Sequence, residues 1–225
     1  LTLNSTITIG GFAARVEFSG TQTLAGNGSV QFLGADNRKG LRVSDADTTL
    51  TIGPGITVGG TGSGFIGYNS NWFGGPNSVS VVNQGTIQVD GTGQNVVIDG
   101  RAFNNFGTVA ATGGGTLDAR NLTTNSSTMT ADGGTVRVGG SWTNAGTLRS
   151  INNGTVELSG SFNVSAIGNF QRDGGTVKLN GILDNSGTTL NLDATGPWQL
   201  LGGTIRGGTV TAAANRGLVT TTTVS

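Results

Sequence analysis

The sequence predicts an all-β fold, a parallel β-helix (β-solenoid) with three short strands per coil, about 20 residues per coil and about ten coils. Three observations predict it. An asparagine recurs at a nearly fixed spacing, short strand-like segments repeat at the same spacing, and glycines recur where these segments end. A fixed period with positions locked in phase indicates a repeat array, so residues 1–225 are expected to form a single elongated unit.

The asparagine column is the clearest repeat, because each member is followed three residues later by threonine. Its members are Asn83, Asn105, Asn125, Asn144 and Asn185, at steps of 22, 20, 19 and 41 residues. Stacked at one bend, their side-chain amides are expected to bond to one another as a structural ladder. The last step spans two coils, in which Val164 takes the place of asparagine. We therefore expect a local break at Val164, followed by a longer connection through residues 169–173.

Residues 86–210 are expected to form the regular coils. The segments GTLDA (115–119), GTVRV (134–138), GTVEL (154–158), GTVKL (175–179) and GPWQL (196–200) each place two apolar side chains on one face. The outward column between them alternates in charge and reads Asp118, Arg137, Glu157, Lys178, Gln199. Neighbouring strands lie ~4.8 Å apart, so these opposite charges are expected to pair. A second inward column holds Phe103, Leu122, Trp142, Phe162 and Leu183, and a third strand carries Val109, Met129 and Leu148.

Residues 1–85 are less regular but are expected to continue the coil. Ile7 and Ile9 precede Val30 and Phe32 by 23 residues, and these in turn are predicted to align with Leu50 and Ile52 after 20 more. Residues 60–78 interrupt the period as an aromatic loop. Residues 211–225 are expected to be a terminal strand or a connection to a neighbour. Glycines at the bends supply the positive φ angles that tight turns require.

Composition narrows the possible functions. The 12 basic and 12 acidic residues are scattered, which removes the electrostatic basis for binding nucleic acid or an anionic membrane. There is no cysteine and no histidine, so thiolate metal sites and the usual neutral-pH acid/base group are absent. No apolar run approaches the ~20 residues of a membrane span. Leu1 opens within a strand-like alternation, so the chain is expected to be a processed or excised piece of a secreted or cell-surface protein.

The aromatic loop is the candidate ligand site. It places Phe65, Tyr68, Trp72 and Phe73 among glycines and asparagines. Aromatic faces beside adaptable amides can hold a sugar ring, and a loop on a rigid scaffold is a common place for binding residues. The expected partner is a glycan or another cell-surface ligand. In the simpler alternative, these rings fold back over the side of the solenoid and cover its apolar surface.

Other candidate sites are weaker. Asp36, Asp45 and Asp47 could supply oxygens to calcium, but they lack the spacing of a calcium-binding loop, and solvated turn carboxylates are the usual explanation. Asp99 and Arg101 are of the types used in carbohydrate cleavage, yet no cluster of carboxylates accompanies them. We therefore expect no catalytic site, no metal site and no cofactor. A column of threonines suggests ice binding as another possible function. Its members are Thr116, Thr135, Thr155 and Thr176. The charged column beside it would interrupt the flat array of hydroxyl groups that such binding needs.

Several segments resemble repeats of the filamentous-haemagglutinin and autotransporter-like bacterial β-solenoid family. They are residues 49–69, VNQGTIQV (82–89), SWTNAGTL (141–148), NGTVELSGSF (153–162), residues 173–192 and WQLLGGTIRGGTV (198–210). The resemblance implies a right-handed β-helix outside the cell. It also implies a structural, non-enzymatic segment of an adhesin-like or fibre-forming protein. Both ends look strand-like, so end-to-end stacking with flanking chain or other copies is expected. A carbohydrate-binding or carbohydrate-degrading β-helix is the alternative function.

Overall fold

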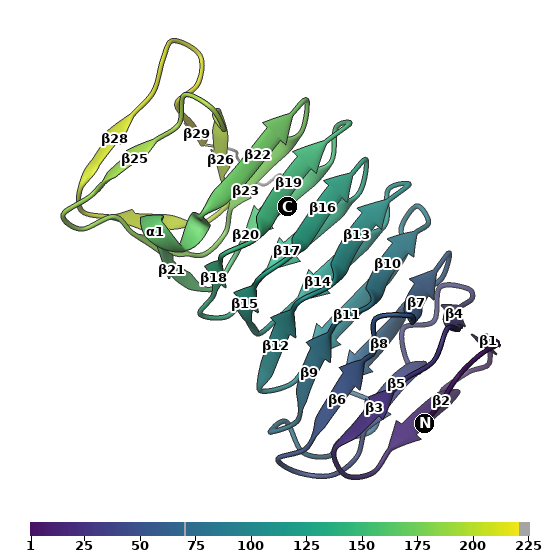
Figure 1. Ribbon diagram of the computed structural model, residues 1–225. Helices are drawn as coiled ribbons and strands as arrows, with labels where there is room; N and C mark the ends of the chain where they lie inside the picture. Colours follow the sequence, from purple (N-terminus) through teal and green to yellow (C-terminus); the bar gives the residue numbers. More distant parts are fainter. Residues whose placement is uncertain (70, 221–225) are drawn as a thin grey trace.

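The chain folds as a parallel β-solenoid with almost no helix (Figure 1). The structure is a computed structural model that describes residues 1–69 and 71–220. Successive coils stack along one axis, from β1 at one end to β28 at the other (Figure 1). The predicted fold class is confirmed, with about 10 turns of about 22 residues each. No helix in the described part of the chain is long and apolar enough to cross a membrane.

The largest sheet runs the length of the rod and has ten parallel strands. They are β2 (Arg15–Phe18), β5 (Gly40–Val43), β8 (Gly64–Gly67), β11 (Asn95–Asp99), β14 (Thr116–Ala119), β17 (Thr135–Val138), β20 (Thr155–Leu158), β23 (Thr176–Leu179), β26 (Trp198–Leu200) and β29 (Leu218–Thr220). The predicted register is confirmed, because Val136 pairs with Val156 and Val156 with Val177, all three fully buried. β29 supplies a strand in the predicted terminal stretch, of which residues 221–225 lie outside the described chain.

Two further sheets complete each coil. The eight-stranded sheet contains β1 (Thr6–Ile9), β4 (Ser29–Phe32), β7 (Thr57–Gly60), β10 (Thr86–Asp90), β13 (Thr108–Thr112), β16 (Thr128–Asp132), β19 (Thr147–Ile151) and β22 (Asn169–Asp173). The six-stranded sheet contains β3 (Gln22–Leu24), β6 (Thr49–Ile52), β9 (Ser80–Asn83), β12 (Ala102–Asn105), β15 (Leu122–Asn125) and β18 (Thr143–Asn144). Inward side chains from all three sheets form one continuous apolar core.

The asparagine ladder lies at the end of the six-stranded sheet and is continuous over four coils. Asn83 donates from Nδ2 to Oδ1 of Asn105 at 2.8 Å, Asn105 donates likewise to Asn125 at 2.8 Å, and Asn125 to Asn144 at 2.7 Å. These four side chains are buried. The structural role predicted for them is therefore confirmed, since each buried amide gains partners in the next coil.

The ladder ends where Val164 replaces asparagine, as predicted. There a short helix, α1 (Val164–Ile167), is inserted, with the Asn163 side chain accepting from the backbone N–H of Ala166 at its start. Asn144 donates instead to the backbone carbonyls of Ile167 and Asn169, at 2.9 and 3.1 Å. The longer connection expected at residues 169–173 is wrong: these residues form β22, and the extra chain lies in α1.

On either side of α1 the strand order changes: a three-stranded sheet takes the place of the six-stranded sheet, and a two-stranded sheet takes the place of the eight-stranded sheet. The first contains β21 (Ser161–Asn163), β24 (Ile182–Asp184) and β27 (Thr204–Arg206), and the second contains β25 (Thr189–Asn191) and β28 (Thr209–Thr211). Asn185 lies here, and its Nδ2 donates only to backbone carbonyls, those of Gly207 and Thr209. Asn185 therefore belongs to the predicted asparagine column but not to the continuous ladder of side-chain hydrogen bonds.

The alignment predicted within residues 1–85 is half right. Ile7 pairs with Val30, as expected, but Val30 pairs with Val58 rather than Leu50. Leu50 lies in a different sheet, opposite Val81. The early coils are longer than 20 residues because the connections over residues 33–39 and 68–79 are longer. The alignment was wrong because β6 has the same alternation of apolar and polar residues as β4, although the two strands lie in different sheets. The expected aromatic loop over 60–78 also contains the strand β8.

Candidate functional site

The four aromatic residues predicted to form a ligand loop take three positions: Phe65 and Phe73 pack on each other, Tyr68 packs partly buried against the core, and Trp72 is exposed. Phe65 lies in β8, opposite Gly40 and Val97, and points away from the apolar core. It is nevertheless only 1% exposed, because the following loop folds over it. The Phe73 ring packs on it with the ring centroids 5.7 Å apart. For these two rings the simpler alternative holds, since they cover the side of the solenoid.

Gly40 explains why the Phe65 ring can lie flat on its sheet. A β-carbon at position 40 would lie 2.8 Å from Cδ1 of Phe65 and 2.0 Å from its carbonyl oxygen. Any side chain there would collide with the backbone as well as the ring. Glycine at position 40 is therefore required for the loop to close over this face.

Two arginines from the first two coils anchor the loop through Phe73. The guanidinium carbons of Arg15 and Arg42 lie 4.6 and 5.9 Å from the centroid of the Phe73 ring. Both guanidinium groups also bind Glu17, at 3.0 and 3.1 Å. The hydrogen bond from Arg15, with the charge of Arg42, lowers the pKa of Glu17 despite its slight burial. The loop is thus held by a charged network together with the packing of Phe73 on Phe65 and of Tyr68 against the core.

Trp72 forms the exposed part of the site, together with a residue that the sequence did not single out. Trp72 is 54% exposed and Phe12, from the turn between β1 and β2, is 71% exposed. The guanidinium carbon of Arg38 lies 4.0 Å from the Phe12 ring centroid and 4.6 Å from that of Trp72. Nε of Arg38 binds Asp36 at 2.7 Å, and this hydrogen bond lowers the pKa of Asp36. We call Phe12, Arg38 and Trp72 the aromatic–arginine patch.

A small hollow adjoins the aromatic–arginine patch. It is lined by Asn37, Phe65, Tyr68, Asn69, Asn71, Trp72, Val97 and Arg120. Its volume is about 40 Å³, room for one or two water molecules. A sugar ring cannot enter it. The candidate site is therefore an open surface with a polar hollow beside it, and not a deep pocket of the kind that encloses small molecules.

The carboxylates considered for calcium or catalysis do not converge. Asp45 accepts from the Ser19 hydroxyl and from the backbone N–H of Gly20, at 2.7 and 2.8 Å. Asp47 pairs with Arg101 at 3.1 Å. Among residues 1–69 and 71–220, no group of three or more acidic, histidine or cysteine side chains could hold a metal ion. Asp99 and Arg101 each have another partner, so they do not form the acid/base pair considered from the sequence.

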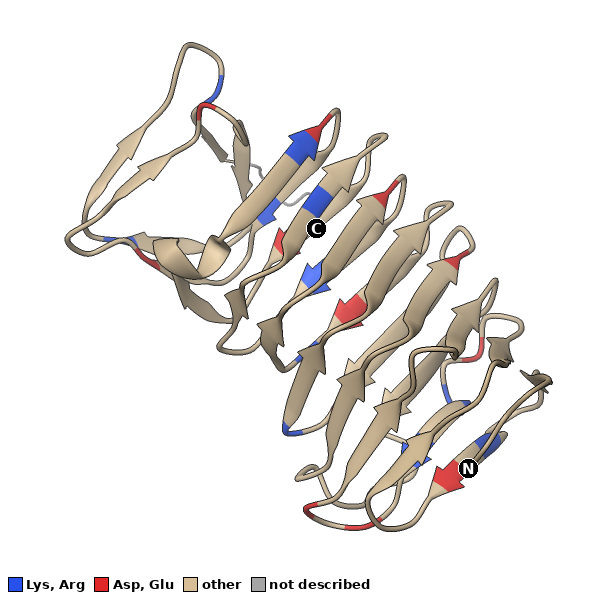
Figure 2. Cartoon of the chain, in the orientation of Figure 1, with Lys and Arg blue, Asp and Glu red and all other residues tan. Residues whose placement is uncertain are grey.

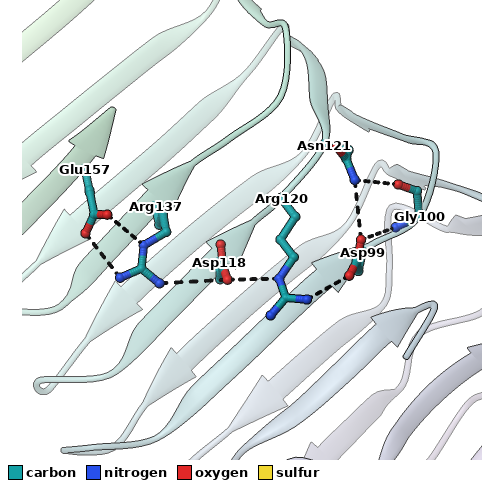
Figure 3. Close-up of polar contacts among 7 residues, drawn as sticks. All are labelled: Asp99, Gly100, Asp118, Arg120, Asn121, Arg137 and Glu157. Atoms are coloured by element: carbon teal, nitrogen blue, oxygen red, sulfur yellow. Dashed lines mark hydrogen bonds and ion pairs between the residues drawn. The ribbon is translucent and has the colours of Figure 1, made fainter. Parts of the chain in front are cut away.

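The outward charge column forms a chain of ion pairs on the ten-stranded sheet (Figure 3). Arg137 binds Glu157 at 3.0 Å and Asp118 at 3.8 Å. Arg120 joins Asp118 to Asp99, at 3.2 and 2.9 Å. Burial would raise the pKa of Glu157, but the hydrogen bonds from Arg137 and Asn180 outweigh it and the pKa is lowered. The predicted register of opposite charges is confirmed.

Sequence reasoning found the column but missed the residues that extend it. Arg120 follows Asp118 by two residues, a spacing that returns a side chain to the same face of an extended chain. That signal could have placed Arg120 on the ladder. Phe12 and Arg38 had no comparable signal, because their turns come together only through the unequal lengths of the first coils.

No family model, no curated protein and no solved structure matches this chain. The resemblance to bacterial adhesin-type solenoids therefore stays a prediction.

Proposed function

We propose that the protein is a structural, non-enzymatic rod within an extracellular adhesin-like or fibre-forming protein. The observation that supports this most strongly is the unbroken ten-stranded parallel sheet, which runs from β2 to β29 through every coil. With ~4.8 Å between coils, about ten coils give a rod ~50 Å long. Such a rod transmits force along its axis and holds other parts of an assembly apart.

Side-chain contacts between successive coils favour a stiff rod. The asparagine ladder and the chain of ion pairs both connect one coil to the next, in addition to the backbone hydrogen bonds. Figure 2 shows that charged residues of both signs are spread along the rod, with most of each sheet uncharged. In the described chain the carboxylates of Asp47 and Asp99 are engaged by arginines, which favours a structural over a catalytic role.

End-to-end contact is part of this proposal. Val210 in β28 and Leu218 in β29 continue the inward columns of Leu190 and Trp198, and both are 38% exposed. Among the described residues, no strand pairs with the outer edges of β28 and β29. Exposed apolar residues beside unpaired strand edges are a template for another chain. The proposed occupant is flanking chain or the first coil of another copy.

The rod is tested by imaging and sedimentation of the 225-residue chain. Negative-stain electron microscopy is expected to show rods, and sedimentation velocity to show heavier species as concentration rises. Leu218→Lys adds a charge to the exposed end and is expected to shift the distribution toward monomer. Thr123→Lys, on the side of the rod, serves as its control. A monomer at every concentration would contradict stacking between copies, and a compact particle would contradict the rod.

Carbohydrate binding is the second candidate, and the exposed Trp72 ring is the observation that favours it. An aromatic face in water, next to the amides of Asn37 and Asn69, can stack on a sugar and bond to its hydroxyls. A glycan array with wild-type protein and Trp72→Ala tests it, with loss of a specific signal as the expected result. Ice binding is less favoured, because the paired charges of Asp118 and Arg137 lie beside the threonine column.

A further inference from the structure

We propose that Arg38 binds the carboxylate of an acidic glycan at the aromatic–arginine patch. The inference rests on the carbohydrate-binding candidate and names its ligand class, a polysaccharide of uronic acid residues. Its basis is the arrangement of Phe12, Asp36 and Trp72 around one guanidinium group. That arrangement engages Nε and leaves the two terminal nitrogens without a hydrogen bond to any described residue.

The two terminal nitrogens of Arg38 are the groups that a ligand could bind. The guanidinium carbon lies over the rings of Phe12 and Trp72, 4.0 and 4.6 Å from their centroids, and the side chain is partly exposed. Nε is engaged by Asp36. No hydrogen bond links Nη1 or Nη2 to another residue in the described part of the chain. A planar group approaching edge-on can therefore accept from both terminal nitrogens at once, and a carboxylate has that geometry.

Net charge does not select the ligand, because the first two coils are balanced. Through the end of β6 they contain four positive and four negative side chains: Arg15, Arg38, Lys39 and Arg42, and Glu17, Asp36, Asp45 and Asp47. The hydrogen bond from Arg38 lowers the pKa of Asp36, so Asp36 stays ionised and offsets part of the charge of Arg38. A carboxylate is therefore favoured by its geometry at the two terminal nitrogens of Arg38 and not by an excess of positive charge.

The side chains of the aromatic–arginine patch are held in place, which favours tight binding of a carboxylate. Arg38 is fixed by its ion pair with Asp36 and by two aromatic rings. The loop that carries Trp72 is anchored by the contact between Phe73 and Arg15. Little side-chain freedom remains to be lost on binding. A pyranose ring attached to the bound carboxylate would lie against the exposed parts of Phe12 and Trp72. Its hydroxyls would face the amide-lined hollow.

The ligand chemistry distinguishes an acidic glycan from simpler anions. A free carboxylate or phosphate would use the guanidinium edge but leave the exposed aromatic surface uncovered. A neutral glycan would use the rings but leave the guanidinium edge without a matching acceptor. A uronic acid polymer satisfies both, because each sugar carries an apolar face and a carboxylate. Its repeating units also allow neighbouring arginines to attract the same chain.

Isothermal titration with a hexamer of galacturonic acid tests the proposal, and its methyl ester serves as the matched uncharged ligand. We expect the acid to bind about 10- to 100-fold more tightly than the ester, the range for one charged bidentate contact. Arg38→Gln is expected to remove this preference. Arg38→Lys keeps the charge without the fork and is expected to restore it only in part.

The controls distinguish the carboxylate inference from the carbohydrate-binding function on which it rests. Arg149→Gln removes an exposed arginine from β19, on another sheet, and is expected to leave binding unchanged. Equal binding of acid and ester would overturn the carboxylate inference while the carbohydrate candidate stands. Binding of dextran sulfate as tight as that of the hexamer would also overturn it, since a nonplanar sulfate would then suffice. Failure of every glycan to bind would overturn both.

Circular dichroism and thermal unfolding of each variant check that the fold is kept. If Arg38→Gln unfolds the loop, Trp72→Ala and Phe12→Ala supply the second test. Each is expected to weaken binding of acid and ester alike while keeping the preference for the acid. Loss of the preference in these variants, with Arg38 in place, would contradict the assignment of the carboxylate to Arg38.

Discussion

The coils before α1 and the coils after it differ on two of their three sides, and the difference shows what determines the shape of the rod. Before α1, asparagines at the end of the six-stranded sheet bond to one another from Asn83 to Asn144. After α1, Asn185 donates to backbone carbonyls and accepts from the Thr188 hydroxyl, with no bond to another asparagine among the described residues. Near α1 a three-stranded sheet takes the place of the six-stranded one, and a two-stranded sheet that of the eight-stranded one. The ten-stranded sheet continues through both regions, so it keeps the coils in register where the other two sides change.

The largest expected effect is in the middle of the ladder. Asn125→Leu removes the donor to Oδ1 of Asn144 and the acceptor for Asn105, whose Nδ2 keeps only the Thr128 carbonyl, so one buried hydrogen-bonding position is left unpaired on each side. We expect the free energy of unfolding to fall by about 2 to 5 kcal/mol, since each buried unpaired polar group costs about 1 to 3 kcal/mol. Urea denaturation followed by circular dichroism measures it. A loss below that of Asn185→Leu would remove the distinction between the two regions.

Arg137 tests the sheet that the two regions share. Arg137→Met leaves the largely buried Glu157 carboxylate without its guanidinium partner, and we expect a loss of about 1 to 3 kcal/mol at pH 7. The native pKa of Glu157 is lowered, so its contribution is present above the unfolded pKa and is lost as pH falls through the native value. The difference between variant and wild type should therefore narrow below about pH 4. Unfolding curves from pH 7 to pH 3 check this, and a constant difference would contradict it.

Asn185→Leu tests how much a buried asparagine stabilises the coils after α1. Its Nδ2 lies 3.2 and 2.9 Å from two carbonyl oxygens near the exposed end of the rod, where water can replace part of what is lost. We expect a loss of about 1 to 2 kcal/mol, smaller than for Asn125→Leu. Hydrogen exchange at the amides of β24 and β27 should rise while that of β13 and β16 stays unchanged. Exchange that rises equally in all four strands would mean that the regions unfold as one unit.

The smallest effect is expected at Phe12, in the first coil of the region before α1. Its ring is 71% exposed, so Phe12→Ala should change the free energy of unfolding by less than about 0.5 kcal/mol. Thermal unfolding measures it. A larger loss would show that the first coil depends on the aromatic–arginine patch for stability, and not only for binding.

Much of the fold was predictable because like residues pair with like residues along the axis. The columns through Val136, Asp118 and Asn105 could be read from spacing, and each was confirmed. The break at Val164 was also predictable, but α1 was not, since four residues are too few to display a helical period. The Val30 alignment failed because strand alternation alone does not say which sheet a segment joins.

The candidate site was only partly predictable. The sequence indicated the aromatic loop, and Trp72 lies on its surface as a binding residue would. It could not separate Trp72 from Phe65, because burial there depends on Gly40 in the coil before. Nor could it find Arg38 against Phe12, since that contact joins turns 26 residues apart whose spacing follows no period.

The ladder also makes the rod's length adjustable. Every amide in it donates in the same direction, so an added coil bearing asparagine would give and receive the same bonds as its neighbours. Only the end members differ: Oδ1 of Asn83 is buried without a partner among the described residues, and Asn144 turns to the backbone beside α1. Duplication or deletion of one coil between them leaves both terminations chemically unchanged. Genetic recombination within this stretch can therefore alter the reach of the molecule in whole-coil steps while its two ends keep their surfaces.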